Sequence, residues 1–268
     1  MPATLWSHIN YLIDAKFINC VNITEYDIRK ANISILYQKG IITEEQYNYL
    51  FCLPKQNREA AVGLMILDNP NIDNIIKKGI IEAKKWLFDM NNINDPEVLR
   101  ISNDSIFLTR GIPLKYTSMG HVEFIPKAKY DTFARIADLT IFFASTMDEL
   151  DLEVKGLGKY QIPLHENYML NFIANLFCLI NTQPISTVID YYMSFYNQYI
   201  NRQLDIRFYR ELNSDSCYTI PFNTGSNFTR IGFSYATDPK QIDISYNAGI
   251  LRELYGIISD LHQRTISR

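Results

Sequence analysis

Two aspartates are the side chains of this sequence whose positions point most directly to chemistry. Asp27 ends an alternating run of apolar and polar residues at 21–27, and Asp104 lies between two short apolar runs. A carboxylate at a strand end and another in a neighbouring hairpin turn would face one point from rigid elements. Two divalent ions held there could bind the attacking and leaving oxygens of a phosphoryl transfer, and carboxylates suit such hard cations. Asp27 and Asp104 are therefore the candidate catalytic and metal-binding residues, with Mg²⁺ or Mn²⁺ as the expected cofactor.

Three basic residues are candidates for binding the phosphates of a substrate. Lys55 and Arg58 lie in Pro-Lys-Gln-Asn-Arg-Glu-Ala-Ala-Val-Gly at residues 54–63, and Lys127 follows a predicted strand. A lysine offers phosphate a point charge, and an arginine offers a fork of donors. We therefore assign substrate binding to Lys55, Arg58 and Lys127.

Each of these candidates also has an interpretation that needs no ligand. Asn-Asp between two apolar runs is a common hairpin turn, so Asp104 could be an ordinary turn residue. Asp27 could cap the following helix, and the basic candidates could be solvated surface charges. Aromatic and basic residues nearer the C-terminus also have two interpretations, because they could contact nucleic acid or pack against the protein core. These are Tyr191, Tyr192, Tyr196, Tyr199, Tyr209, Arg207, Arg210, Arg230 and Arg252.

The residues around Asp27 predict one strand followed by several helices. Apolar residues alternate with polar ones before Asp27 and follow helical spacing after it. Thr43 is a predicted N-cap with Gln46 three residues on, the pattern of a capping box. The last of the helices carries an isoleucine-rich stripe, with four lysines elsewhere, which predicts a surface helix with one buried side. The elements are a strand at 21–27 and helices at 28–37, 43–51, 56–67 and 72–91, and the lysines are Lys77, Lys78, Lys84 and Lys85.

The residues around Asp104 and beyond predict a mixed α+β chain, because strands and helices do not alternate regularly. Asn103 and Asp104 join two apolar runs in a tight β-hairpin. Gly156 and Gly158 mark a loop, which suggests one domain over residues 1–160 and a second region over 161–268. An acidic run of Asp148, Glu149, Asp151 and Glu153 is predicted to be a solvated loop. The remaining elements are strands at 98–102, 105–109, 121–125, 207–212, 217–222 and 229–235, a short apolar run of either type at 139–143, and helices at 165–181, 185–203 and 247–263.

Two segments resemble motifs of the palm of family B DNA polymerases. Residues 25–36, Glu-Tyr-Asp-Ile-Arg-Lys-Ala-Asn-Ile-Ser-Ile-Leu, resemble the first palm motif, in which an aspartate closes a strand before a helix. Residues 101–107, Ile-Ser-Asn-Asp-Ser-Ile-Phe, resemble the third motif, with Asp104 at its metal-bridging aspartate and Ser102 where the family has another aspartate. The helix over 75–88 also resembles the helix that precedes that motif. The resemblance covers about residues 20–145.

This resemblance implies a palm-like antiparallel sheet with helices on one face, followed by a thumb-like or accessory region. It implies a polymerase-like nucleotidyltransferase that acts on a nucleic-acid primer and template with a nucleoside triphosphate, as in DNA replication. The chain departs from the family because it lacks the Asn-Ser-x-Tyr-Gly motif and leaves no room for a conventional fingers domain. A non-catalytic palm-derived subunit of a viral or mobile-element replication complex is therefore the alternative. An unrelated interaction protein with a chance hairpin is a third hypothesis.

Composition limits the remaining classes. The chain has 268 residues, of which 47% are hydrophobic and 13% aromatic, enough for a substantial core. A net charge of −3 argues against a protein that simply coats DNA, since phosphate neutralisation requires many basic residues. No basic segment followed by a long apolar stretch is present, and no apolar run is long enough for a membrane span. We expect a cytoplasmic protein, in the host cytoplasm if it is viral, with no membrane partner.

Overall fold

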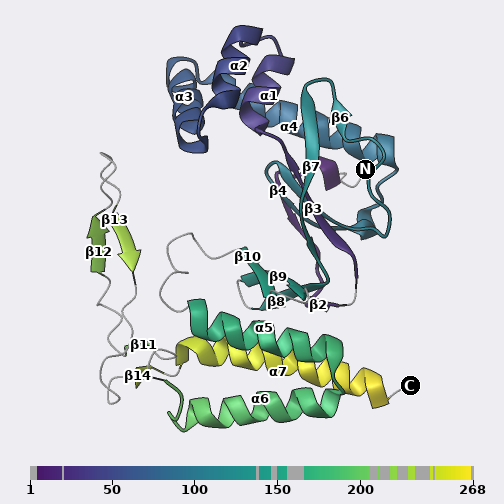
Figure 1. The fold of residues 1–268 in the computed structure, drawn as a ribbon, viewed down its shortest axis with the longest axis vertical. Coiled ribbons are helices and arrows are strands. Elements are labelled where there is room, and N and C mark those ends of the chain that lie inside the picture. Colours follow the sequence, from purple (N-terminus) through teal and green to yellow (C-terminus); the bar gives the residue numbers. More distant parts are fainter. Residues whose placement is uncertain are drawn as a thin grey trace. The chain divides into compact units, whose positions relative to one another are not determined.

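The computed structural model describes residues 5–19, 21–136, 139–145, 150–155, 166–205, 210–211, 218–221, 229–232, 242–243 and 245–266. Backbone contacts divide the chain into two compact units (Figure 1). The first contains residues 1–14 and 22–129, and the second contains residues 15–21 and 130–268. The chain therefore crosses between the units after residues 14, 21 and 129, and the last of these crossings lies before the boundary near residue 160 that the glycines predicted. Each unit is mixed α and β, and its paired strands are antiparallel, as the α+β prediction requires.

The first unit is built on a six-stranded sheet with the order β1-β4-β5-β3-β7-β6. Strand β5 lies between β4 and β3 and pairs with both in antiparallel register. This arrangement brings the end of β3 beside the turn of the β4–β5 hairpin, because Asp27 pairs with Ser105. The strands are β1 Asn10–Leu12, β3 Ile23–Ile28, β4 Val98–Ser102, β5 Ser105–Thr109, β6 Ser118–Met119 and β7 Val122–Tyr130.

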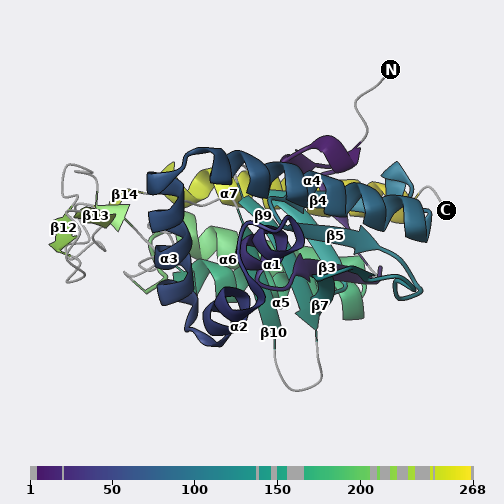
Figure 2. The ribbon, with the colours of Figure 1, turned by 90° about the horizontal axis from the view of Figure 1, so that it is seen from above.

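Four helices and one face of this sheet share a hydrophobic core. Tyr26 and Ile28 of β3 belong to this cluster together with Ile33 of the following helix and Leu87 of the longest one. Figure 2 shows α4, the longest of these four helices, and α4 is in contact with α1. The helices are α1 Ala31–Gln38, α2 Glu44–Cys52, α3 Lys55–Asp68 and α4 Asn71–Asn91, with short 3₁₀ turns η1 Leu5–Ser7 and η2 Asp95–Glu97.

Local sequence signals predicted some of these ends and not others, since α1 begins at Ala31 and not at residue 28, and β7 ends at Tyr130 and not at residue 125. Thr43 caps α2 as predicted, since its hydroxyl accepts from the Gln46 N–H and the Gln46 side chain accepts from the Thr43 N–H. The hairpin between β4 and β5 also forms as predicted. Asn103 adopts the left-handed conformation in its turn, with φ of 50°, which asparagine tolerates better than most residues.

The second unit combines a four-stranded sheet with three long helices. The sheet has the order β10-β9-β8-β2, and α5 and α7 contact its strands. A second hydrophobic cluster includes Phe143 of β9, Phe177 of α5, Tyr192 of α6 and Leu254 of α7. The elements are β2 Phe17–Ile18, β8 Thr132–Ile136, β9 Leu139–Ser145, β10 Leu150–Lys155, α5 Glu166–Thr182, α6 Ile185–Ile200 and α7 Ser245–Ile266, with two small ribbons of β11 Arg210–Glu211 with β14 Ile242–Asp243 and β12 Tyr218–Pro221 with β13 Thr229–Gly232.

Two predictions from the sequence are wrong. The acidic run was expected to be a loop, but Asp151 and Glu153 lie within strand β10, where they pair with β9. Lys84 was placed on the solvated side of its helix, but its side chain is fully buried. Some residues to which the sequence predictions apply lie outside the described residues: 148–149, 156, 158, 165, 207–209, 212, 217, 222 and 233–235. No helix among those described has the length and apolar character that a bilayer crossing needs.

Candidate functional site

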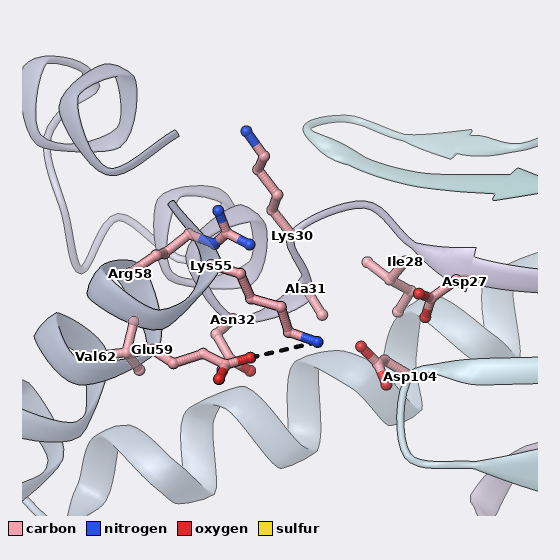
Figure 3. Close-up of a pocket in the computed structure, with 10 residues that line it drawn as sticks. All are labelled: Asp27, Ile28, Lys30, Ala31, Asn32, Lys55, Arg58, Glu59, Val62 and Asp104. Carbon is pink, nitrogen blue, oxygen red and sulfur yellow. Dashed lines mark ion pairs between the residues drawn. The ribbon is translucent and has the colours of Figure 1, made fainter. Parts of the chain in front are cut away.

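Four of the five predicted site residues line one pocket of the first unit. The pocket has a volume of about 220 Å³ and is bordered by the β3–α1 connection, the β4–β5 turn and the start of α3 (Figure 3). Asp27, Lys55, Arg58 and Asp104 line it, and Lys127 does not. The remaining lining residues are Ile28, Lys30, Ala31, Asn32, Glu59 and Val62.

Asp27 is directed toward this pocket by the alternation of strand β3. Its neighbours Tyr26 and Ile28 are buried in the helix-covered core, and successive side chains of a strand face opposite sides. Asp27 therefore lies on the face of the sheet opposite that core, where it is half-buried. Glu25, two residues earlier, shares this face and is 1% exposed. The strand thus places two carboxylates on one side of the sheet.

Asp104 reaches the same pocket from the adjoining hairpin turn. Its backbone carbonyl accepts a hydrogen bond from the Ile28 N–H at 3.1 Å, which ties the turn to the end of β3. Burial raises the pKa of the Asp104 carboxyl above its usual value. A hydrogen bond from its own backbone and the charges of Lys55 and Lys127 oppose this rise in pKa, and the charge of Glu25 adds to it. In Figure 3 the carboxylates of Asp27 and Asp104 lie on the same side of the pocket.

The first turns of α3 supply two basic side chains. Lys55 is largely exposed and forms an ion pair with Glu59 at 3.7 Å, one helical turn away. Figure 3 shows its amino group between Glu59 and Asp104. Arg58 is half-buried, and its guanidinium donates to the Leu53 carbonyl at 3.1 Å. Arg58 is thus held by the backbone, whereas Lys55 could exchange its surface partner for a ligand at little cost.

Lys30 is a third basic residue of the pocket that the sequence analysis did not assign. It has a φ of 50° in the β3–α1 connection. Its amino group donates to the Phe51 carbonyl and lies 3.3 Å from the centroid of the Phe51 ring. Partial burial and the charges of Arg58 and Arg29 lower the pKa of Lys30. Its side chain runs away from the two aspartates in Figure 3, so it bounds the far side of the pocket.

Lys127 lies on the charged face of the sheet. Its amino group pairs with the buried carboxylate of Glu25 at 3.1 Å. Arg100 lies near the same carboxylate: burial lowers the pKa of Arg100, and the charge of Glu25 partly restores it. Lys127 therefore acts on the pocket through its charge, by lowering the pKa of Asp104.

Lys84 is a buried cation next to the site. It is 0% exposed, and its amino group donates to the His8 carbonyl at 2.6 Å. Burial lowers the pKa of Lys84 to about 8, and the negative charge of Asp104 partly opposes this decrease. The same N-terminal segment also contacts the turn directly, because the Asn103 N–H donates to the Ile9 carbonyl at 2.8 Å. Lys84 and residues 8–9 thus support the hairpin that carries Asp104.

Glu25, Lys84 and Lys30 were not predicted as part of the site, although the sequence carries a signal for the first two. Glu25 precedes Asp27 by two residues on the same predicted strand, so strand alternation places both on one face. Lys84 follows Ile80 by four residues and Ile76 by eight, which places it on the buried stripe of its helix. The position of Lys30 depends on a left-handed backbone conformation and on contact with Phe51 of another helix. Its sequence context gives no signal for either.

The acidic side chains of the site are few. Among the residues that the structure describes, no three Asp, Glu, His or Cys side chains gather into a group that could hold a metal ion. The pocket instead pairs two aspartates with basic side chains on its opposite wall. Such an arrangement can accept a cation at one end and an anion at the other.

The fold and this pocket define an α+β protein with two carboxylates from adjoining strands facing three basic residues. The chain belongs to the family of the bacteriophage PBS1 gene 130 protein, whose sequence model matches residues 1–227. The matched range contains every lining residue of the pocket. Comparison with curated proteins gave no match.

Proposed function

We propose that the first unit is a palm-like nucleotidyltransferase domain that uses divalent metal ions on a nucleic-acid primer and template. The observation that carries this proposal is the meeting of Asp27 and Asp104 in one pocket with Lys55 and Arg58. The aspartates come from segments 77 residues apart by their numbers, 104 minus 27. An antiparallel sheet with helices on one face and carboxylates on the other also agrees with the resemblance to the family B palm.

The donor chemistry of the pocket fits Mg²⁺ or Mn²⁺. Mg²⁺ is usually held in proteins by one or two carboxylates and completes its coordination with water and substrate phosphates. Asp27 and Asp104 would hold the ions, which when bound supply charge stabilisation of the attacking and leaving oxygens. Lys55 would leave Glu59 to meet a phosphate, and Arg58 is already oriented by its bond to Leu53.

A non-catalytic palm-derived subunit is the second candidate, and two observations favour it. Ser102 occupies the position where the resembling family has a further aspartate, so the pocket has one carboxylate fewer than that motif supplies. Lys55 forms an ion pair with Glu59, which engages its amino group on its own helix. Such a subunit would bind nucleotide or nucleic acid within a replication complex without transferring a nucleotide.

Metal binding and primer extension together separate these candidates. Mn²⁺ titration, followed through the electron paramagnetic resonance signal of the free ion, measures binding to the wild type and to Asp27→Asn and Asp104→Asn. Asp73→Asn is a matched control, because Asp73 is a surface residue of α4 paired with Lys77. We expect each pocket variant to weaken Mn²⁺ binding at least about tenfold, the loss of one charged ligand, and the control to leave binding unchanged.

Extension of a labelled primer by the purified chain then decides whether catalysis occurs. Extension that both pocket variants abolish supports the enzyme. Metal binding without extension, either alone or with added replication proteins of the phage, supports the non-catalytic subunit. Equal Mn²⁺ binding by the wild type and both pocket variants contradicts either form of the proposal and leaves an unrelated interaction protein.

A further inference from the structure

A second cavity lies between helices α6 and α7, within the second unit. It has a volume of about 610 Å³, in the range of small-molecule sites. Its lining combines three tyrosines, a methionine, a glycine and one arginine, which come from two segments remote in sequence. The residues that matter for the argument are Tyr192, Met193, Tyr196, Gly249, Arg252 and Tyr255.

The three tyrosine rings form one aromatic wall. Tyr192 and Tyr196 are stacked with centroids 6.0 Å apart and an interplanar angle of 16°, and Tyr255 lies 5.9 Å from Tyr192. Tyr192 is nearly fully buried, and its hydroxyl donates to the Leu251 carbonyl at 2.7 Å, which fixes the ring between the helices. Tyr255 is 54% exposed. The wall therefore has a rigid base and an accessible outer ring.

The α7 side of the cavity supplies space and positive charge. A Cβ atom added at Gly249 would meet no other atom within 4 Å, so the helix is open to the cavity at this position. Arg252 follows Gly249 on the same helix, is exposed and lines the same cavity. Among the described residues, no carboxylate forms an ion pair with Arg252. The cavity thus offers flat aromatic surface, unfilled volume and a cation side by side.

We propose that this cavity binds an unpaired nucleotide of a single-stranded nucleic acid. The base would stack on Tyr255 and Tyr196, and Arg252 would contact the adjacent phosphate. Aromatic side chains and arginine are the groups with which proteins bind single strands without reading their sequence. An amphipathic helix of a protein partner would bind through its apolar face, whereas this lining places the charged Arg252 beside its tyrosines. The inference stands apart from the chemistry at Asp27 and Asp104.

Fluorescence anisotropy of a labelled twelve-nucleotide oligothymidine, measured with the full chain in EDTA, tests this site without any contribution from metal. Tyr255→Leu is expected to weaken binding about 5- to 150-fold, the range of one lost base-stacking contact. Tyr255→Phe keeps the ring and should bind as the wild type. Gly249→Leu fills the open space without removing a contact, and it should weaken binding by a similar factor. Arg252→Gln should reduce the logarithmic salt dependence by about 0.7, one phosphate contact on a single strand.

Two controls give each negative result a meaning. Tyr49→Leu removes another exposed tyrosine, 67% exposed in α2 of the first unit, and should leave binding unchanged. Thermal unfolding of each variant confirms that the fold is retained. Equal binding of oligothymidine and an abasic oligomer of the same length overturns the stacking site and leaves only a phosphate contact. The stacking site is also overturned if Tyr255→Leu and Gly249→Leu both bind oligothymidine as tightly as the wild type. Competition by an apolar helical peptide, with no binding of oligothymidine, identifies a protein docking site instead.

Discussion

The buried amino group of Lys84 makes the stability of the first unit depend on pH in a calculable way. Burial lowers the pKa of Lys84 from 10.5 to about 8. The folded protein therefore disfavours the protonated form of Lys84. The stability that the neutral lysine contributes is complete above the unfolded pKa of 10.5, and it is lost as the pH falls through the folded pKa of about 8. The cost of charging Lys84 in the folded state is about 3 kcal/mol at pH 7 and less than about 1 kcal/mol at pH 10.

Replacing Lys84 by methionine removes this titration and leaves the aliphatic packing largely in place. The substitution also leaves the His8 carbonyl without its donor, which costs about 1–3 kcal/mol independently of pH. The difference in unfolding free energy, wild type minus Lys84→Met, should therefore rise by about 2.5 kcal/mol between pH 7 and pH 10. Other groups that titrate in this range contribute equally to both proteins and cancel.

Urea unfolding in metal-free buffer, followed by tryptophan fluorescence, measures this difference. The chain has two tryptophans, Trp6 and Trp86, and both lie in the first unit, so the signal reports the unit that contains Lys84. A difference between wild type and Lys84→Met that stays constant within about 0.5 kcal/mol from pH 7 to pH 10 would refute the reasoning, because it would mean that water reaches the amino group.

Three further substitutions test the site and the packing that supports it. Asp104→Asn should raise the urea midpoint of the metal-free protein at pH 7, because burial raises the pKa of this carboxyl and the fold disfavours its ionised form; the gain should shrink in acid, where the wild-type carboxyl is protonated. Gly79→Ala should lower the unfolding free energy by about 1–3 kcal/mol, since its Cβ would lie 2.3 Å from the Ile35 Cγ2 atom. Its matched control Gly63→Ala meets no atom within 4 Å and should raise the unfolding free energy by about 0.5–1 kcal/mol. Thr43→Ala should lower the unfolding free energy by about 0.5–2 kcal/mol through loss of the capping box, and an unchanged urea midpoint would show that this helix end is open in solution.

The sequence predicted the site in outline because its main elements are locally encoded. Strand alternation fixes the face of Asp27, and an asparagine in a left-handed turn fixes the hairpin that carries Asp104. The pairing of Asp27 with Ser105 then follows from two strands meeting in register. The capping box at Thr43 set the start of α2, and Lys55 opens the next helix, so its place in the pocket depends on few long-range contacts.

The parts that were not predicted depend on contacts between distant segments. Strand β2 has two residues, and it is defined by the pairing of Phe17 with Ala134 and of Ile18 with Phe133, so no periodic pattern could reveal it. This pairing also explains why residues 15–21 belong to the second unit and not to the first. Lys84 was misplaced because charge was taken as evidence of exposure, although its helical position is on the buried stripe.

The charges that line the pocket indicate which ligands it would accept together. Lys30, Lys55 and Arg58 stand against Asp27, Glu59 and Asp104, so three positive groups balance three negative ones. A divalent ion alone would leave an excess of positive charge next to Lys55, and a triphosphate alone would place negative charge beside the aspartates. An ion bound together with a triphosphate satisfies both ends of the pocket, because the ion lies at the carboxylates and the phosphates face the basic wall. Under the proposed function, this balance of charge would favour joint binding of metal and nucleotide over binding of either alone.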